Sequence, residues 1–120
     1  GNALDNVIDA SRSEYLAAGM WLIGGAGADT LIGGSSNDTY FIDDPLDRVI
    51  ESSAFTSSDT IVAQSSFSLD GYASIENLRI GGGWWDVRLG STASGNTLDN
   101  VLRGAGLLSG GAGNDTYVIS

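Results

Sequence analysis

The chain contains no cysteine and no histidine among its 120 residues. It therefore has no disulfide, no thiolate or imidazole ligand for a zinc site, and no imidazole for acid–base catalysis. An enzyme mechanism would have to use paired Asp or Glu residues, as glycosidases do. Asp43 and Asp44 are adjacent, but a turn explains them and no cleft-forming insertion accompanies them. We therefore expect that the chain is not an enzyme.

Positive charge is also scarce. The five basic residues are all arginine and are outnumbered by fifteen acids, twelve of them Asp, so the net charge is −10. This charge argues against nucleic acid as a partner, because phosphate binding needs a basic surface. The excess of Asp over Glu suits turns, where a short carboxylate can bond its own backbone. The composition is thus compatible with a bound cation.

Long hydrophobic runs are missing. The longest uncharged stretch, residues 15–28, has fourteen residues and four glycines, and is too short and too interrupted to cross a bilayer. No basic region followed by an apolar run opens the chain, so no signal peptide is visible. A disordered acidic chain is the simple alternative, but 42% apolar residues at regular spacing argue against it.

What the chain does have is a nine-residue rhythm. Apolar residues recur at this step in three series: Leu22, Leu31, Tyr40 and Val49; Leu69, Leu78 and Val87; Leu108 and Tyr117. Glycine-rich turns lie between them, and glycine suits turn positions that need a positive φ. No window holds a 3.6-residue apolar stripe long enough to indicate a helix.

This rhythm predicts an all-β fold. A strand and turn of nine residues cannot bury its apolar residue alone, but two such units form one flattened coil of eighteen residues. Stacked coils would pair their strands in parallel and align the buried residues in a ladder. We expect a parallel β-roll, or β-helix solenoid, of stacked nonapeptide units, with enough residues for six or seven coils.

One turn sequence is repeated, as Gly-Gly-Ala-Gly-Ala-Asp at 24–29, Gly-Gly-Ser-Ser-Asn-Asp at 33–38 and Gly-Gly-Ala-Gly-Asn-Asp at 110–115. Such a turn can direct backbone carbonyls inward, and it supplies a carboxylate at its sixth position. Calcium accepts about six to eight oxygen ligands in flexible geometry, whereas magnesium requires a strict octahedron. The nonapeptide is also a repeat signature of calcium-binding β-helices. We therefore expect calcium at these turns.

The coil length pairs the aspartates. Asp47 lies eighteen residues after Asp29 and closes a degenerate turn of the same kind, so the two carboxylates should stack with a cation between them. The position one coil after Asp38 is a threonine, and Asp59 follows three residues later. Glu51 and Asp59 could both serve a second site if the loop between them bulges.

These features resemble the RTX (repeats-in-toxin) family, the hemolysin-type calcium-binding β-roll. The likeness rests on Asn-Asp-Thr-Tyr-Phe-Ile-Asp at 37–43, Asp-Thr-Ile-Val at 59–62, Ile-Glu-Asn-Leu at 75–78 and Gly-Asn-Thr-Leu-Asp-Asn-Val-Leu at 95–102, and it covers nearly the whole chain. It implies a calcium-binding module of a large bacterial protein that is exported by type I secretion and folds outside the cell.

The resemblance also implies the ligands, because the family holds calcium with the sixth-position Asp and with carbonyls of two successive turns. Carried onto this sequence, the first site has Gly25, Gly27, Asp29, Ile42, Asp44 and Asp47; the second has Gly34, Ser36 and Asp38, with Asp59 as a candidate; the third has Gly110, Ala112 and Asp115. The partner turn of the third site would lie at 94–97 or beyond residue 120.

The sequence departs from the family pattern at several places. Ser36 replaces a glycine, an insertion lengthens residues 9–21, and Trp85 stands where Asp would be. We expect one β-roll over residues 1–120, with calcium-site turns in 1–59, ligand-poor coils in 60–102 and the start of a further repeat in 103–120. Trp84 and Trp85 are candidates for partner contact, although packing over the roll is the plainer interpretation.

A longer repeat accompanies the short one. Residues 1–8 return at 95–102 with six of eight identical, and residues 33–42 return at 110–119 with seven of ten identical. We therefore expect that the chain starts one module and stops inside the next.

We expect a structural module that binds two to four calcium ions and folds as it binds them in the extracellular medium, with no membrane span. One alternative is a self-associating building block, such as an adhesin stalk, surface layer or filament, because open solenoid edges invite end-to-end stacking. Another is the carboxy-terminal module of a secreted enzyme or toxin.

Overall fold

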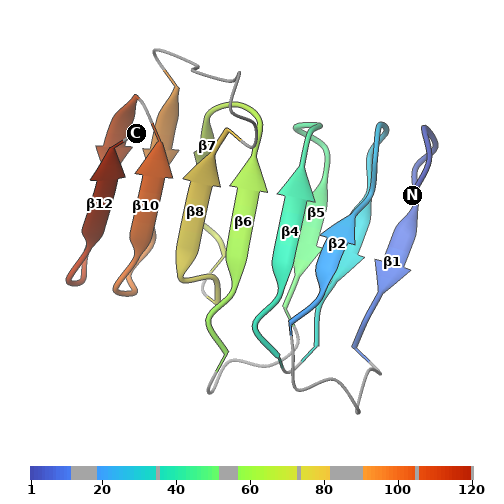
Figure 1. Cartoon of the computed structure of the whole chain (residues 1–120), viewed down its shortest axis with the longest axis horizontal. Helices are drawn as coiled ribbons and strands as arrows, with labels where there is room; N and C mark the ends of the chain where they lie inside the picture. The colour runs from blue at the N-terminus through green and yellow to red at the C-terminus, as the bar shows by residue number, and fades with distance from the viewer. Residues whose placement is uncertain are drawn as a thin grey trace. The chain divides into compact units, whose positions relative to one another are not determined.

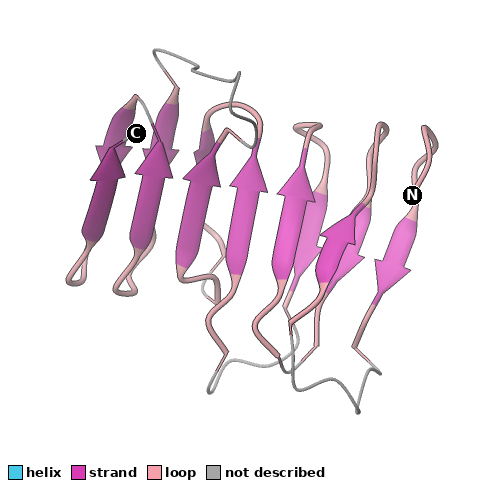
Figure 2. Ribbon diagram, in the orientation of Figure 1, coloured by secondary structure: helices cyan, strands magenta, loops and turns pink. Residues whose placement is uncertain are grey.

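The structure is a computed structural model that describes residues 1–11, 19–34, 36–51, 57–72, 74–81, 91–104 and 106–119. The strands are β1 (Val7–Asp9), β2 (Trp21–Ile23), β3 (Thr30–Ile32), β4 (Thr39–Ile42), β5 (Arg48–Ile50), β6 (Thr60–Ala63), β7 (Phe67–Ser68), β8 (Asn77–Ile80), β9 (Thr92–Ser94), β10 (Val101–Gly104), β11 (Leu107–Ser109) and β12 (Thr116–Ile119). Figure 2 shows only strands and connecting loops in these residues, without a helix. The fold is a parallel β-solenoid, as the nine-residue rhythm predicts, and it has about five turns.

The chain divides into two compact units, Gly1–Asp59 and Thr60–Ser120. In the first unit, alternate strands form two parallel sheets in the orders β1-β3-β5 and β2-β4. In the second unit the orders are β6-β8-β10-β12 and β7-β9-β11. Within each unit, successive strands thus alternate between two layers (Figure 1).

The coils differ in length. The step between paired strands is eighteen residues from β2 to β4 and from β3 to β5. It is 23 residues from β1 to β3, 24 from β8 to β10 and fifteen from β10 to β12. The expectation of six or seven coils is therefore wrong, because insertions in the longer coils use residues that would otherwise have formed further turns.

Each unit buries a ladder of apolar side chains between its two sheets. Residues of this ladder are at most 8% exposed: Leu22, Leu31, Tyr40 and Val49 in the first unit, and Ile61, Leu69, Leu78 and Leu102 in the second. The flanking residues of β2 and β5 point outward, which gives each short strand one inward side chain. Of the other predicted ladder residues, Leu108 is half-buried, Tyr117 is 49% exposed on the end strand β12, and Val87 lies outside the described residues.

Among the residues that the structure describes, no helix has the length and apolar character needed to cross a membrane.

The ladder predicts unequal effects of shortening its members. Leu31 is fully buried between Ile8 and Val49, so Leu31→Ala should lower the free energy of unfolding by about 2–5 kcal/mol through lost burial and an unfilled cavity. Ile50 on the next strand is 45% exposed, and Ile50→Ala should cost less than about 1 kcal/mol. Urea unfolding at saturating calcium measures both, and equal losses would contradict the inward and outward assignment.

Candidate calcium-binding turns

Three turns of the first unit, residues 1–6, 24–29 and 42–47, stack in the order of strands β1, β3 and β5. Their sixth-position residues are bonded in series. The N–H of Asn6 donates to Asp29 Oδ1 at 2.9 Å, and the N–H of Asp29 donates to Asp47 Oδ1 at 2.8 Å. Each carboxylate therefore bridges its own coil to the preceding one.

Asp29 is the residue whose bonding is incomplete. Its side chain is 1% exposed, and its second oxygen, Oδ2, has no hydrogen-bond partner. Within the described residues it is the only buried side-chain oxygen or nitrogen in that condition. A buried, ionised oxygen without a donor is costly, so this atom calls for a positively charged ligand.

Asp47 presents the contrasting case. Its Oδ1 accepts the N–H of Asp29, and its Oδ2 accepts the N–H groups of Asp43 and Asp44, both at 3.1 Å. Three backbone donors stabilise its negative charge. The structure therefore brings Asp29 and Asp47 into register, as predicted, but only Asp29 has an oxygen left without a donor.

The glycines of turn 24–29 have distinct structural roles. Gly24, at the first position, has no room for a Cβ because the Asp29 carboxylate occupies that space. Gly25 and Gly27 have φ of 95° and 107°, in the region that other residues rarely adopt. A Cβ on Gly25 would also lie 2.7 Å from the carbonyl oxygen of Asn2 in the adjacent turn. The turn can therefore form only with glycine at these positions.

Negative charge is concentrated in the same unit. Residues 1–59 contain ten acids and two arginines, a net charge of −8, whereas residues 60–120 contain five acids and three arginines, a net charge of −2. Partial burial and the neighbouring carboxylates of Asp47, Asp29 and Asp44 raise the pKa of Asp43 above its ordinary value. The stacked turns thus create a local field that favours a cation.

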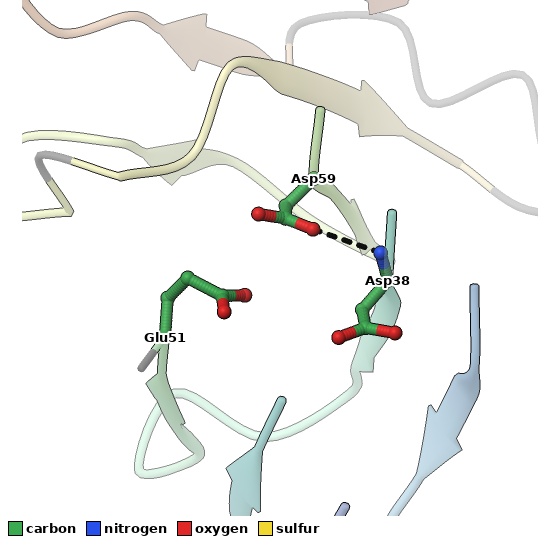
Figure 3. Close-up of side chains that lie close together, drawn as sticks. All are labelled: Asp38, Glu51 and Asp59. Carbon is green, nitrogen blue, oxygen red and sulfur yellow. Dashed lines mark hydrogen bonds between the residues drawn. The ribbon is translucent and has the colours of Figure 1, made fainter. Parts of the chain in front are cut away.

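A second cluster lies on the other edge of this unit. One carboxylate oxygen each from Asp38, Glu51 and Asp59 lies within 4.8 Å of the others. Figure 3 shows the three side chains pointing into a common space, with the N–H of Asp38 bonded to Asp59 Oδ1 at 2.8 Å. Asp38 and Asp59 are at most 1% exposed, and Glu51 is half-buried. At an effective dielectric near 20, two charges about 5 Å apart repel by roughly 3 kcal/mol.

Several donors already support this cluster. Asp38 accepts the N–H groups of Met20 and Gly34, each at 2.8 Å, and Asp59 accepts the hydroxyl of Ser57 at 2.9 Å. Burial, together with the like charge of Asp38, raises the pKa of Asp59 above its ordinary value despite these hydrogen bonds. The raised pKa means that the ionised form of Asp59 is still under-stabilised.

Tyr40 is a member of this site that the sequence analysis did not identify. The fully buried ring places its hydroxyl against Glu51, to which it donates a hydrogen bond. Burial and this bond raise the pKa of Tyr40 far above its ordinary value, so the hydroxyl remains a donor. The sequence did contain a signal for this role. A tyrosine occupies the ladder position at which the preceding repeat has Leu31.

The turn 33–38 differs in shape from turn 24–29. Gly34 has no positive φ, unlike Gly25 at the corresponding second position. A Cβ on Gly33 would collide with the Tyr40 hydroxyl and lie 2.8 Å from the Asp38 carboxylate. The predicted carbonyl ligands Gly34 and Ser36 therefore occupy a turn unlike that of Gly25 and Gly27, and side-chain carboxylates dominate the second cluster.

In the second unit, turn 110–115 repeats the shape of turn 24–29. Gly111 and Gly113 have φ of 89° and 107°. Asp115 Oδ1 accepts the N–H of Asn100 at 3.0 Å, so this turn stacks on turn 95–100, the nearer of the two partners that the sequence left open. Asp115 is only half-buried and Ala112 is exposed. The sixth position of the partner turn is an asparagine, so this pair has one carboxylate instead of two.

The assignment of calcium ligands stays a prediction for every residue named, and three further members are placed as follows. Ile42 is buried at the end of β4, and the carbonyl of Asp44 accepts the N–H of Asp47 at 3.1 Å within the same turn. Gly110 donates its N–H to the Tyr117 hydroxyl at 3.0 Å. Trp84 and Trp85 lie outside the described residues.

A comparison with known protein families gives one match. Residues 21–42 and 94–118 match the RTX calcium-binding nonapeptide repeat, in four copies. These two segments carry RTX repeats. No curated protein matched the chain, and no solved structure did. RTX repeats bind calcium, and their family is typical of secreted bacterial proteins.

The match coincides with the geometry described above. It includes both RTX turns that have two positive-φ glycines, together with Asp29, Asp38 and Asp115. Its first segment ends at residue 42, before Asp47 and before the Glu51 and Asp59 that complete the second cluster. Those partners are therefore supplied by residues outside the matched repeats.

The residues present fit calcium. They offer carboxylate and carbonyl oxygens, which are the ligands that this ion prefers. Asp29 contributes a buried oxygen without a donor, and the second cluster contributes three carboxylates around one space. Calcium at either place would supply the missing positive charge, and the RTX repeats are accordingly a calcium-binding structural module.

The two roles of glycine can be separated by substitution. Gly71 has φ of 88° but nothing within 4 Å of an added Cβ, whereas a Cβ on Gly25 would meet the carbonyl of Asn2. Gly71→Ala should therefore cost about 1 kcal/mol of unfolding free energy from backbone strain alone. Gly25→Ala should cost distinctly more and should also weaken calcium binding. Chemical unfolding and calcium titration measure these effects, and equal losses in the two variants would contradict close packing of the turns.

Proposed function

We propose that this chain is a structural module that becomes ordered when calcium binds between its stacked turns, and that it does so in the extracellular medium. The observation that carries the proposal is the buried Asp29 Oδ2, which has no hydrogen-bond donor in a turn of RTX sequence. No catalytic role is proposed, because the paired carboxylates already serve the stacking of coils.

The proposed mechanism couples metal binding to folding. Without calcium, stacking the coils buries Asp29, Asp38, Asp47 and Asp59, each at most 6% exposed. Burying these charges is unfavourable, and their backbone donors offset only part of the cost. Asp29 Oδ2 still lacks a donor, and the three carboxylates of the second cluster still lie close together. Because the unfolded chain has no such stacked turns, calcium binds the folded form preferentially and stabilises it by mass action.

Three places support the proposed two to four ions. Asp29 with Asp47 forms the first, the cluster of Asp38, Glu51 and Asp59 forms the second, and Asp115 forms the third. The first two contain two or three carboxylates and should bind more tightly than the third. Extracellular calcium modules have dissociation constants of about 0.1–1 mM, which matches calcium outside cells and leaves the module unloaded inside them.

A calcium titration followed by circular dichroism tests the proposal. The strand signal should be weak in chelator and should grow with a midpoint of about 0.1–1 mM calcium, because ordering requires the bound ion. Magnesium at the same concentration is the control and should leave the signal low. A full strand signal in chelator, unchanged by calcium, would overturn the proposal.

Light scattering recorded in the same titration addresses self-association. In the first unit, Trp21 is 73% exposed and Leu46 is 70% exposed. Such exposed apolar side chains favour a self-associating building block as the second candidate function. Scattering that rises with calcium and protein concentration would support that candidate, and a strict monomer would oppose it.

Asp29→Asn separates the metal role of the carboxylate from its hydrogen bonds. Asparagine already occupies the sixth position at Asn6 and Asn100, so the turn tolerates it. The variant should raise the calcium midpoint about tenfold, equivalent to roughly 1.4 kcal/mol of binding free energy. It should also be more stable than the parent in chelator, because a buried charge has been removed.

Asp5→Asn is the matched control for that variant. Asp5 is exposed and its Oδ1 accepts the N–H of Ala28 at 2.9 Å, a bond that asparagine retains. The control changes the same charge without touching the buried oxygen, so its calcium midpoint should stay close to that of the parent. If both variants shift the midpoint equally, general charge and not Asp29 Oδ2 determines binding.

A further inference from the structure

A tight turn in the second unit follows strand β7. The N–H of Tyr72 donates to the carbonyl of Leu69 at 2.8 Å, which closes a four-residue turn over residues 69–72. Gly71 is its third residue and has φ of 88°, as in a type II turn. Leu69 is fully buried, whereas Asp70 and Gly71 are both exposed. The Asp-Gly pair therefore lies at the surface, next to a residue of the buried ladder.

The reactive groups of this pair are not held by hydrogen bonds. Within the described residues, the Asp70 carboxylate accepts no hydrogen bond and the Gly71 N–H donates none. Asp70 donates its own N–H to the Ser68 hydroxyl at 3.1 Å, which leaves the carboxylate unengaged. A Cβ on Gly71 would meet nothing within 4 Å, so the turn is also open on that side. A free carboxyl group thus stands beside a free and unhindered amide nitrogen.

The aspartates of the stacked turns differ in this respect. After Asp29, Asp38, Asp47 and Asp115, the N–H of the next residue is bonded at 2.7–2.8 Å to a carbonyl of another coil; the donors are Thr30, Thr39, Arg48 and Thr116. Asp44 is followed by proline, which has no N–H. Among the twelve aspartates of the chain, only Asp70 is followed by glycine. The sequence and the hydrogen bonds therefore single out the same residue.

We propose that Asp70 is a modification site, at which aspartate isomerises to isoaspartate. The Gly71 nitrogen attacks Cγ of the protonated Asp70 carboxyl group and loses its proton. A C–N bond forms, a C–O bond of the carboxyl group breaks, and one water molecule leaves. The product is a five-membered succinimide ring that contains the Gly71 nitrogen.

Water then opens the ring at one of its two carbonyl carbons. Addition at Cγ restores aspartate, whereas addition at the main-chain carbonyl carbon leaves the backbone running through Cγ, which is isoaspartate. The water lost in the first step returns in the second, so the reaction needs no further reactant.

The fold makes this reaction selective. Ring closure requires rotation of the backbone between the aspartate and the residue after it. At Asp70 this rotation disturbs only the turn bond of Tyr72, whereas at Asp29 it would break the bond from Thr30 that joins two coils. Glycine also offers a nitrogen without an adjacent side chain, whereas threonine crowds it with a branched one.

Isomerisation would alter a contact inside the second unit, because it adds a methylene carbon to the backbone between Leu69 and Tyr72. The carbonyl of Tyr72 accepts the side-chain amide of Asn96 at 2.8 Å. A longer turn displaces this carbonyl, so isoaspartate should weaken the link between the turn and the coil that contains Asn96. The inference involves neither calcium nor the stacked aspartates, so it can fail while the proposed function stands.

Incubation of the folded chain at saturating calcium, in water labelled with a heavy oxygen isotope, tests the proposal. Mildly acidic pH is used because the protonated carboxyl group is the one attacked. Trypsin cleaves after Arg48 and Arg79, so one peptide, residues 49–79, contains both Asp59 and Asp70. Isoaspartate that carries the heavy oxygen should accumulate at residue 70, while Asp59 in the same peptide stays unmodified. No isoaspartate at residue 70, or equal amounts at both residues, would overturn the proposal.

Three variants test the chemistry. Asp70→Glu is the matched control, because it keeps the charge but would need a six-membered ring, which forms far more slowly; the modification should be lost. Gly71→Ala places a methyl group next to the attacking nitrogen and should slow the reaction severalfold. Asp70→Asn reaches the same ring by releasing ammonia and should form isoaspartate faster than the parent at neutral pH. If Asp70→Asn forms none, the Gly71 nitrogen does not reach Cγ and the proposal is wrong.

The effect on the fold is measured on the isoaspartate form after its separation from the unmodified chain. Its Tyr72 amide should exchange hydrogen about tenfold faster than in the parent, because the bond to Leu69 is weakened. Asp70→Glu should keep the exchange rate of the parent. Equal exchange in all three chains would contradict the proposed effect on the turn.

Discussion

The sixth-position carboxylate is the group on which this structure depends. With one oxygen it accepts an N–H of the preceding coil at Asp29, Asp47, Asp38 and Asp115. Asp59, three residues beyond the regular position, accepts the N–H of Asp38 in the same way. These contacts also bury negative charge, and a buried charge must be balanced by donors or by a cation.

Other features of the turns follow from that requirement. The first-position glycine is needed because the carboxylate fills the space of its Cβ, at Gly24 and again at Gly110. The positive φ of the second and fourth glycines folds the chain tightly around the same group. The two edges of the first unit then balance the charge differently. One leaves Asp29 Oδ2 without a donor, and the other gathers three carboxylates beside a buried tyrosine.

The asparagine turns meet the same stacking requirement without charge. Asn100 accepts the N–H of Asn96 and donates to the carbonyl of Glu76, so it links two coils as a neutral group. A junction of this kind buries no charge at its sixth position, whereas the stacked aspartates of the first unit, with its net charge of −8, do. The chain thus combines coils that stack through carboxylates with a coil that stacks through neutral amides.

The sequence predicts this structure well where the period is regular. Asp29 and Asp47 are one coil of eighteen residues apart, and the structure places them in register. Asp38 and Asp59 are 21 residues apart, so the period alone predicted the wrong partner position for Asp38. Asp59 could be predicted only by assuming extra residues in the loop before it. Two kinds of bond depend on which groups face each other across coils of unequal length: that of Tyr40 to Glu51, and those of the Asn96 side-chain amide to the carbonyls of Tyr72 and Ile75. A fixed step cannot supply that information, and for the same reason it overestimated the number of turns.

The central claim is that stacking of the charged coils depends on a bound cation. Hydrogen exchange of the Asp29 and Asp38 amides tests it most directly, because these two N–H groups donate to Asp47 and Asp59 across successive coils. The account predicts strong protection of both amides at millimolar calcium and little protection in chelator. Equal protection in the two conditions would show that the buried carboxylates stack without a metal, and would contradict the account.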